Sequence, residues 1–474
     1  MQKVLSLLVV LALATGVAPP TSVAPRIPDT PAGHALVGWL QAFDSGDRAT
    51  FLAFLKSRYP SAINRLDDDW QFRQMTGGFV VRAIVTSAPT QVVATVEDLL
   101  NEQFATMTVL TQSKAPYVIE RIDLRAIATP AELAPPPMSQ SELIAALGSK
   151  LDSETAADRF SGAVLVARDG QPVFARAYGL ADREHNVPNA LETRFRMGSM
   201  NKMFTAVSIL QLAKAGKVNL DAPLGTYLTD YPNKDVAAQV TIAELLDHTG
   251  GTGDIFGPDF DAHRLELRTL QDYEKRYGSR ALAFTPGSKW EYSNYGFVLL
   301  GLVIEKVSGQ TYYDYVREHI YAPAGMTSTA SEPENEAVPG RSTGYMLDPN
   351  GKLVPNTETL PYRGTSAGGG YTTVGDLLKF ANALQQNELL DARYTQLLTT
   401  GKVDTPAGGR YAYGFEDQQF NGLRCFGHGG GAPGMNGDLE ICPADGYVVA
   451  VLANMDPPAA TRIANFLTAR LPAR

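Results

Sequence analysis

The sequence lacks several features that would each point to a function. It has no run of Lys and Arg residues, and its formal net charge is -9 over 474 residues. A protein that binds a nucleic-acid backbone needs the opposite charge balance. It also contains no phosphate-binding loop, no dinucleotide fingerprint and no group of residues with metal-ligand spacing. We therefore expect no nucleic-acid partner, no cofactor and no metal ion.

Cysteine is also scarce, because only Cys425 and Cys442 occur, both near the carboxyl end. They flank a Gly-rich turn at positions that could face each other across a hairpin. In an oxidising compartment the two could pair, whereas reduced thiols in the core are an equal alternative. Their spacing, with one His nearby, does not make a metal site.

Long apolar runs are missing except at the amino terminus. Lys3 precedes the apolar stretch from Val4 to Ala14, which has about the length of a signal-peptide core. A bilayer span needs roughly twenty apolar residues, and no other segment reaches that length without charges. We predict a signal peptide over residues 1–24, a secreted or periplasmic location and no stable membrane span. A tethered or disordered amino terminus is the alternative.

At this length two domains are expected. Residues 30–130 predict a small α+β domain in which two helices, His34–Phe43 and Ala49–Lys56, precede four alternating strands. This order resembles the cone-shaped fold of nuclear transport factor two-like domains. The strands carry no paired acid and base, so we expect an accessory role, with dimerisation through this domain as one form of it. A Pro-rich linker over residues 131–140 follows.

Residues 141–474 predict a second domain with strands at both ends and a long helical middle. Gly162–Arg168 and Val173–Tyr178 form a hairpin around the turn dipeptide Asp169-Gly170. Near the end of the chain, Tyr447–Leu452 is a continuous apolar run typical of a strand covered on both faces. The pattern predicts a split antiparallel sheet that is flanked by helices and holds an all-α insertion.

The sequence Ser199-Met200-Asn201-Lys202 begins an apolar helix that stops at Gly216. Lys202 lies one turn after Ser199, on the same face. A helix amino terminus favours developing negative charge, and a buried lysine can lose its proton near neutral pH and act as a base. We interpret Ser199 as a nucleophile and Lys202 as its proton acceptor. The alternative is an ordinary N-cap serine.

A second motif, Tyr292-Ser293-Asn294, lies where a loop enters an apolar helix. A tyrosine beside a cation can ionise below its usual pKa and shuttle protons, so Tyr292 is a catalytic candidate. The amide of Asn294 could hold Lys202 or a substrate carbonyl. The alternative is an Asn N-cap beside a core tyrosine.

The third motif is His428 followed by Gly429, Gly430 and Gly431. Consecutive glycines on a strand let the backbone approach a ligand closely and leave N–H groups free. We predict that His428, Gly430 and Gly431 bind substrate and that the Gly431 N–H is an oxyanion donor. The alternative is a flexible turn.

In this order the three motifs resemble the serine β-lactamase and penicillin-binding-protein superfamily, in particular its class C-like esterase and D,D-peptidase branch. Two further segments, Leu245–Gly251 and Ser366–Tyr371, are similar to later family segments. The resemblance covers roughly residues 141–474 and implies a β-lactamase/transpeptidase-like fold. His248, within the first of these segments, is expected to make only a structural hydrogen bond in a turn.

The resemblance also implies a role for each residue. Ser199 would become acylated, Lys202 would assist its deprotonation, and Tyr292 would carry the proton to the leaving group and later activate water. Asn294 would hold the lysine and the substrate. The N–H groups of Ser199 and Gly431 would form the oxyanion hole.

One departure bears on the substrate. The family usually has Lys-Thr-Gly or Lys-Ser-Gly where this chain has His428-Gly429-Gly430. The missing lysine and hydroxyl normally help to bind a substrate carboxylate. We therefore expect a serine hydrolase acting on a small-molecule or peptide acyl substrate, esterase-like in preference to a D,D-peptidase or β-lactamase. A catalytically retired binding module is the non-enzymatic alternative.

A second serine competes for the role of nucleophile. Gly364-Thr365-Ser366-Ala367-Gly368 matches the G-x-S-x-G elbow of α/β-hydrolases, with His428 downstream. Leu360–Arg363 is not a buried strand, however, and Gly369-Gly370 is a poor start for a helix. The sequence therefore favours Ser199.

Overall fold

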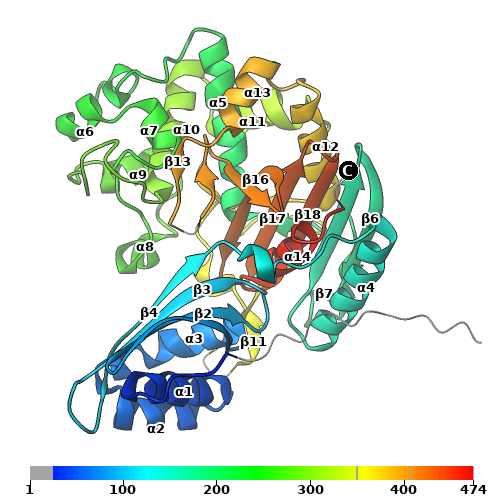
Figure 1. Ribbon diagram of the computed structural model, residues 1–474. Helices are drawn as coiled ribbons and strands as arrows, with labels where there is room; N and C mark the ends of the chain where they lie inside the picture. Colours follow the sequence, from blue (N-terminus) through cyan, green and yellow to red (C-terminus); the bar gives the residue numbers. More distant parts are fainter. Residues whose placement is uncertain (1–24, 349–350, 407, 473–474) are drawn as a thin grey trace, which may run out of the picture.

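The protein is described by a computed structural model covering residues 25–348, 351–406 and 408–472. The predicted signal peptide lies outside these described residues. Figure 1 shows a small amino-terminal unit, in blue and cyan, beside a larger unit built from the rest of the chain. Within the described ranges, no helix is both long enough and apolar enough to cross a bilayer.

The small unit packs helices against an antiparallel sheet of order β1-β2-β3-β4 (Figure 1). Its elements are α1 (Pro31–Asp44), α2 (Arg48–Arg58), α3 (Leu66–Thr76), β1 (Phe79–Ala88), β2 (Gln91–Asp98), β3 (Phe104–Thr111) and β4 (Ile119–Ile127). Trp39 and Phe43 of α1 stack with ring centroids 4.4 Å apart, and Phe51 of α2 meets Phe43 edge-on. Register shifts after Val81 and Ile84 interrupt the β1–β2 ladder, and such bulges bend a strand.

The third helix corrects the expectation of two. The helix α3 begins Leu66-Asp67-Asp68-Asp69, and of its residues only Leu66 and Thr76 are buried. Because its remaining residues are exposed or only half-buried, the helix has no continuous apolar stripe for the sequence to display. It ends at Gly77, which adopts the left-handed conformation common at helix ends.

The larger unit is built on an eight-stranded antiparallel sheet of order β13-β14-β15-β16-β17-β18-β5-β6. The strands are β5 (Gly162–Arg168), β6 (Gln171–Tyr178), β13 (Val403–Asp404), β14 (Arg410–Tyr411), β15 (Glu416–Phe420), β16 (Leu423–Ala432), β17 (Met435–Cys442) and β18 (Tyr447–Ala453). The predicted hairpin of β5 and β6 is confirmed, with Asp169 and Gly170 at positive φ. Because β18 pairs with β5, the two ends of this unit meet in one sheet, as the split-sheet prediction requires.

Helices cover both faces of this sheet. The helices α4 (Gln140–Ala156) and α14 (Ala459–Thr468) pack on one face, in a core with Val449 and Val451. The helices α5 (Asn201–Lys214) and α12 (Val374–Gln385) share the opposite core with Val448 and Ala450. Burial on both sides explains why β18 reads as an unbroken apolar run.

The predicted helical insertion lies between β6 and β13. Besides α5 and α12, its helices are α6 (Lys234–Gln239), α7 (Ile242–Leu246), α8 (Pro258–His263), α9 (Leu270–Tyr277), α10 (Asn294–Ser308), α11 (Tyr312–Val316) and α13 (Ala392–Thr399). Short strands line its edges: β7 (Leu180–Asp182), β8 (Val187–Pro188), β9 (Phe195–Arg196), β10 (Tyr345–Leu347), β11 (Leu353–Pro355) and β12 (Tyr371–Thr372). The helix α10 is buried from Asn294 through Ile304 and packs against α5, so these two helices form the centre of the insertion.

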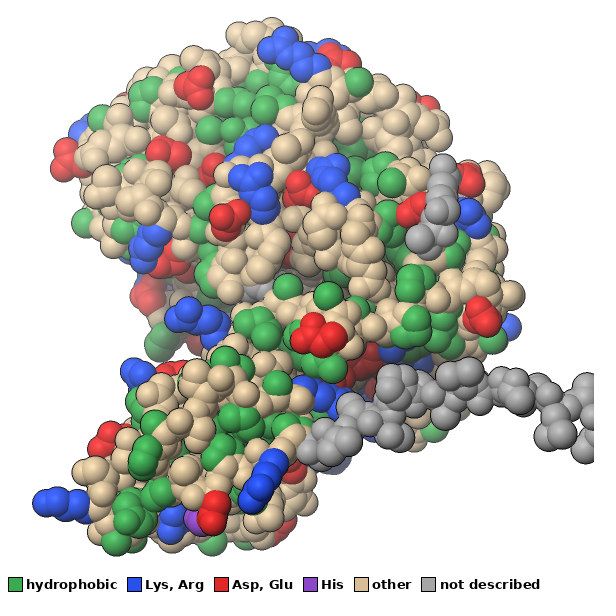
Figure 2. Space-filling view, viewed as in Figure 1, with side chains coloured by type: hydrophobic (Ala, Val, Ile, Leu, Met, Phe, Trp, Pro, Cys, Tyr) green, Lys and Arg blue, Asp and Glu red, His purple; other side chains and the backbone are tan. Residues whose placement is uncertain are grey.

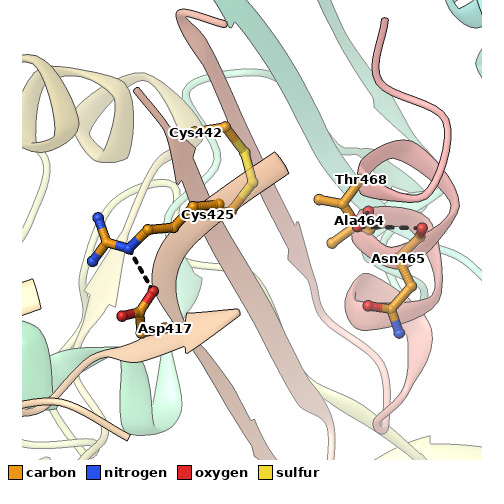
Figure 3. Close-up of a disulfide and its surroundings, with 7 residues drawn as sticks. Asp417, Cys425, Cys442, Ala464, Asn465 and Thr468 are labelled. Atoms are coloured by element: carbon orange, nitrogen blue, oxygen red, sulfur yellow. Dashed lines mark hydrogen bonds and ion pairs between the residues drawn. A yellow bond between two sulfur atoms is a disulfide. The ribbon is translucent and has the colours of Figure 1, made fainter. Parts of the chain in front are cut away.

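The two cysteines form a disulfide that joins neighbouring strands (Figure 3). Cys425 of β16 and Cys442 of β17 have Cα atoms 4.2 Å apart, one position beyond the paired residues Phe426 and Ile441. Both sulfur-bearing residues are fully buried in the core shared with α14. Of the two alternatives left open by the sequence, the structure has the paired one.

Figure 2 shows charged side chains of both signs interspersed over the visible face of both units. This mixed surface differs from the continuous basic stripe of nucleic-acid-binding proteins.

Candidate active site

Ser199 lies at the junction between the sheet and the insertion, two residues before α5 begins at Asn201. It belongs to a single helical turn, Gly198–Met200, that leads directly into the buried helix. Gly198 has φ of +55°, and a Cβ atom there would lie 2.9 Å from the Gly431 nitrogen. Glycine is thus required both by the backbone conformation and by the approach of β16. The half-buried side chain of Ser199 lines a cavity of about 660 Å³.

Lys202 lies beneath Ser199, with none of its surface exposed. Its Nζ is 3.2 Å from the Ser199 Oγ, 2.7 Å from the Asn294 Oδ1 and 2.5 Å from the Ala367 carbonyl oxygen. The last two atoms can only accept hydrogen bonds. A neutral amine would satisfy both with its two hydrogens and present its lone pair to the serine hydroxyl.

Electrostatics favours that neutral form. Burial lowers the pKa of Lys202 to about 7, an effect that the nearby carboxylate of Asp254 partly opposes. A lysine with such a pKa is neutral in a substantial fraction of molecules at neutral pH and can accept a proton. The arrangement therefore gives Ser199 a base within hydrogen-bond reach.

Asn294 connects the lysine to Asp254, a residue that the sequence motifs did not reveal. It is the first residue of α10, whose N-cap is Ser293. Its side-chain Nδ2 donates to Asp254 Oδ2 at 3.1 Å, and its backbone N–H donates to Asp254 Oδ1 at 3.0 Å. Because Nδ2 is engaged in this way, Oδ1 is the atom that faces Lys202. Asp254 lies 38 residues before Tyr292 and belongs to no recognisable motif, so the sequence offered no signal for it.

Tyr292 lies against the same lysine, with its ring centroid 4.7 Å from Nζ, and its hydroxyl hydrogen-bonds Ser199. The expectation of a lowered pKa is wrong for this residue. Desolvation raises the pKa of Tyr292 by more than its hydrogen bond with Ser199 lowers it. The neighbouring amine does not compensate, because with a pKa of about 7 Lys202 is already neutral at the high pH where a tyrosine ionises. Tyr292 is thus a protonated hydroxyl placed to pass a proton, and Lys202 is the stronger candidate for the base.

The strand β16 passes the start of α5 with three consecutive glycines. A Cβ atom on Gly430 would lie 2.0 Å from the Met197 carbonyl oxygen and 3.0 Å from the Ser199 nitrogen, so no side chain fits there. Gly431 is exposed and lines the cavity with Ser199. The backbone nitrogens of Ser199 and Gly431 therefore lie on adjacent segments at the cavity wall, an arrangement suited to two oxyanion donors.

His428 is turned away from this wall. It is 3% exposed, its Nε2 is 2.9 Å from the Tyr411 hydroxyl, and its Nδ1 is 2.5 Å from the Gly429 carbonyl oxygen. Since that carbonyl only accepts, Nδ1 carries the proton and Nε2 accepts from Tyr411. Burial lowers the pKa of His428 to about 3, so the imidazole is neutral and supplies no positive charge for a substrate carboxylate.

His248 and Ser366 lie near the site without facing the cavity. The Nδ1 of His248 accepts from the Ser293 N–H at 3.2 Å, the kind of structural bond expected of it. Ser366 is fully buried, and its Oγ has no hydrogen-bond partner among the described residues. The segment around Ser366 is a tight turn closed between Thr365 and Gly368, so it is not a strand-to-helix elbow.

Comparison with known proteins identifies the larger unit. The family model described as beta-lactamase matches residues 147–473. The chain belongs to the beta-lactamase family. Its members include serine hydrolases, and the β-lactamase/transpeptidase-like fold is shared with solved penicillin-binding proteins. The amino-terminal unit lies outside the matched residues.

Two curated relatives of this beta-lactamase-family chain differ in their named roles. Penicillin-binding protein 4* of Bacillus subtilis is 29% identical over 296 residues, covering 58% of this chain and 64% of that protein. Esterase EstB of Burkholderia gladioli is 35% identical over 219 residues, covering 43% and 56% respectively. The matches thus span less than two thirds of these relatives.

Two solved structures match this chain over nearly their whole length. A penicillin-binding protein from Bacillus halodurans is 34% identical with a TM-score of 0.62, covering 66% of this chain and 98% of its own. A D-stereospecific amidohydrolase from Streptomyces sp. is 29% identical with a TM-score of 0.59, covering 68% and 97%.

Proposed function

We propose that this beta-lactamase-family chain hydrolyses neutral esters through a covalent acyl-enzyme formed on Ser199. The observation that carries the proposal is the position of Lys202. Its fully buried Nζ lies 3.2 Å from the Ser199 Oγ, and its two other contacts are acceptors that a neutral amine can satisfy with its two hydrogens. No structural need explains such a costly buried amine, since a buried lysine without a carboxylate partner destabilises the fold.

The proposed steps use only side chains and backbone of this site. Ser199 Oγ forms a bond to the acyl carbon while its proton passes to Lys202, and the N–H groups of Ser199 and Gly431 stabilise the oxyanion. The bond to the leaving oxygen then breaks, and the proton reaches that oxygen through Tyr292. Water attacks the acyl-enzyme in a second step, giving its proton to the same relay and releasing the acid and the free serine.

The cavity favours an uncharged, apolar substrate. Its wall is dominated by apolar side chains: Ile255, Phe256, Phe260, Tyr273, Leu360, Pro361, Pro433 and Met435. Two arginines also line it. The Nε, Nη1 and Nη2 atoms of Arg264 donate to the backbone carbonyls of Leu360, Asp261 and Glu358. The Arg363 guanidinium lies 3.4 Å from the Tyr313 ring centroid and donates to the Ser331 carbonyl. Both guanidinium groups are therefore partly engaged by the protein itself.

The experiment compares turnover of p-nitrophenyl acetate and butyrate with that of nitrocefin and of a D-amino acid amide, in wild type and Ser199→Ala. The proposal predicts that the esters have the highest kcat/KM and that Ser199→Ala abolishes their turnover. A preference for the amide would favour the amidohydrolase-like alternative, and a preference for nitrocefin would favour a β-lactamase. Absence of turnover on every substrate would overturn the proposal and favour a binding module.

A further inference from the structure

The Gly430–Gly431 peptide is held from the neighbouring strand by one side chain. Asn436 of β17 lies directly opposite Gly431, and its Nδ2 donates to the Gly430 carbonyl oxygen at 2.7 Å. In a trans peptide, this carbonyl and the following N–H point in opposite directions. The Gly431 N–H is therefore directed away from Asn436. On that far side lies Gly198, whose added Cβ would be 2.9 Å from the Gly431 nitrogen.

Glycine at these positions creates the need for such a restraint. Gly430 must lack a side chain because the Met197 carbonyl and the Ser199 nitrogen approach it so closely. A run of glycines has no side chains to fix its peptide planes and gains the most from an outside hydrogen bond. An oxyanion donor acts only when its N–H is held in a fixed direction before the reaction. The bond from Asn436 supplies that restraint.

The amide of Asn436 is itself fixed at its other end. Its Oδ1 accepts hydrogen bonds from the backbone N–H of Ala460 at 2.7 Å and of Thr461 at 3.1 Å. These donors belong to the first turn of α14, where N–H groups have no partner within the helix. With oxygen facing two donors and nitrogen facing a carbonyl, only one orientation of the amide satisfies every contact. Asn436 is 3% exposed, so water does not compete for it.

The helix α14 is anchored in turn. Arg462, 4% exposed, donates from Nη1 to Glu154 of α4 and from Nε to Asn101 of the amino-terminal unit, both at 2.9 Å. A chain of direct contacts thus joins the turn between β2 and β3, the first turn of α14, Asn436 and the Gly430–Gly431 peptide.

We propose that Asn436 is a positioning residue for the oxyanion hole, holding the Gly431 N–H toward the acyl oxygen from a scaffold provided by α14. This inference rests on the proposed ester hydrolysis at Ser199. It assigns to Asn436 no contact with the substrate, so its loss should lower kcat and leave KM nearly unchanged.

The test compares Asn436→Leu with Asn454→Leu. The two asparagines are 3% and 2% exposed, and Asn454 also donates to backbone carbonyls, those of Leu180 and Thr343, away from the site. Both variants should lower Tm. Active sites are titrated to completion with a fluorophosphonate, and kcat on p-nitrophenyl acetate is expressed per titrated site. A displaced donor costs about 10- to 100-fold. We expect such a loss for Asn436→Leu, KM within about threefold, and kcat within about twofold of wild type for Asn454→Leu.

Asn436→Asp keeps the acceptor for the α14 N–H groups and is measured alongside, at pH 8.5, where an ionised carboxylate cannot donate to Gly430. A loss of kcat in both Asn436 variants alone supports the inference. Unchanged kcat per site in Asn436→Asp, or an equal loss in Asn454→Leu, overturns it while wild-type turnover leaves the proposed function standing. Absence of wild-type turnover overturns the proposed function itself, and this inference with it.

Discussion

Ser199 and Ser366 both occupy sequence patterns of known nucleophiles, yet their surroundings differ in every respect that matters for chemistry. Ser199 is half-buried, lines the 660 Å³ cavity and lies 3.2 Å from the Lys202 amine. Ser366 is fully buried, and a Cβ atom on Gly301 of α10 would lie 2.2 Å from its Oγ. The first serine has a base and access to substrate, whereas the second has neither.

The segment around Ser366 nevertheless serves the site through its backbone. The Ala367 carbonyl oxygen accepts from the Lys202 Nζ at 2.5 Å, and the Ser366 carbonyl accepts from Thr205 of α5 at 2.7 Å. The G-x-S-x-G motif therefore marks a segment that contributes to the site, although the segment contributes backbone carbonyls and not the hydroxyl of Ser366.

The largest effect is expected from exchanging the serines for alanine. Ser199→Ala should lower kcat for p-nitrophenyl acetate by at least about 10³-fold, because loss of a nucleophile removes the whole covalent route. Ser366→Ala should stay within about twofold of wild type, since its hydroxyl touches neither cavity nor base. Initial-rate assays of both variants check this. A large loss of kcat in Ser366→Ala would contradict the distinction between the two serines.

Replacing the base should come next in size. Lys202→Met keeps the length of the side chain and removes the proton acceptor, and general-base catalysis contributes about 10²- to 10⁴-fold. The same change should raise Tm most below pH 7, where the folded protein must charge a buried amine. This gain should shrink as pH rises from 7 toward 10.5, where the unfolded lysine also becomes neutral. Thermal unfolding at pH 6 and pH 9.5 measures it, and a Tm that falls equally at both would contradict the assignment.

The pH dependence of wild type should follow the same group. Because Lys202 has a pKa of about 7 and must be neutral to accept the serine proton, kcat/KM should rise with pH and reach half its plateau near pH 7. A rate profile from pH 5 to pH 9 on a neutral ester checks this. A flat profile would exclude the lysine as base.

A smaller shift should follow from Asp254→Asn. The carboxylate of Asp254 raises the pKa of Lys202, so its removal should move the midpoint of the profile to lower pH. Asp67→Asn, an equal change of charge in the exposed first turn of α3, is the control and should leave the midpoint in place. Equal shifts in both variants would assign the effect to net charge.

The smallest effect concerns stability at the second serine. Its Oγ is buried without a partner among the described residues, so Ser366→Ala should stabilise the fold by about 1 kcal/mol. Urea unfolding at pH 8 measures this. A loss of stability would show that the hydroxyl makes a compensating contact.

Much of the larger unit was predictable because its elements repeat strong local patterns. The β5–β6 hairpin follows from Asp169-Gly170, and the buried helices α5 and α10 follow from their continuous apolar runs. The helix α3 was missed because few of its residues are buried and they show no apolar period.

The site was predictable only as far as its motifs extend. Motif spacing indicated Ser199 and Lys202, because helix geometry fixes which side chains share a face. Asn294 was indicated by its place in the motif Tyr292-Ser293-Asn294, where a loop enters a helix. Asp254 and Asn436 act through contacts between segments far apart in the chain, and neither has a local signature. The expected pKa of Tyr292 was wrong because burial depends on the whole fold, which a three-residue motif does not encode.

The most direct test of the central claim is covalent labelling with a fluorophosphonate, followed by intact mass and peptide mapping, in wild type, Ser199→Ala and Ser366→Ala. The account predicts a single adduct in wild type and Ser366→Ala, mapped to the peptide containing Ser199, and none in Ser199→Ala. An adduct that persists in Ser199→Ala and disappears in Ser366→Ala would contradict it.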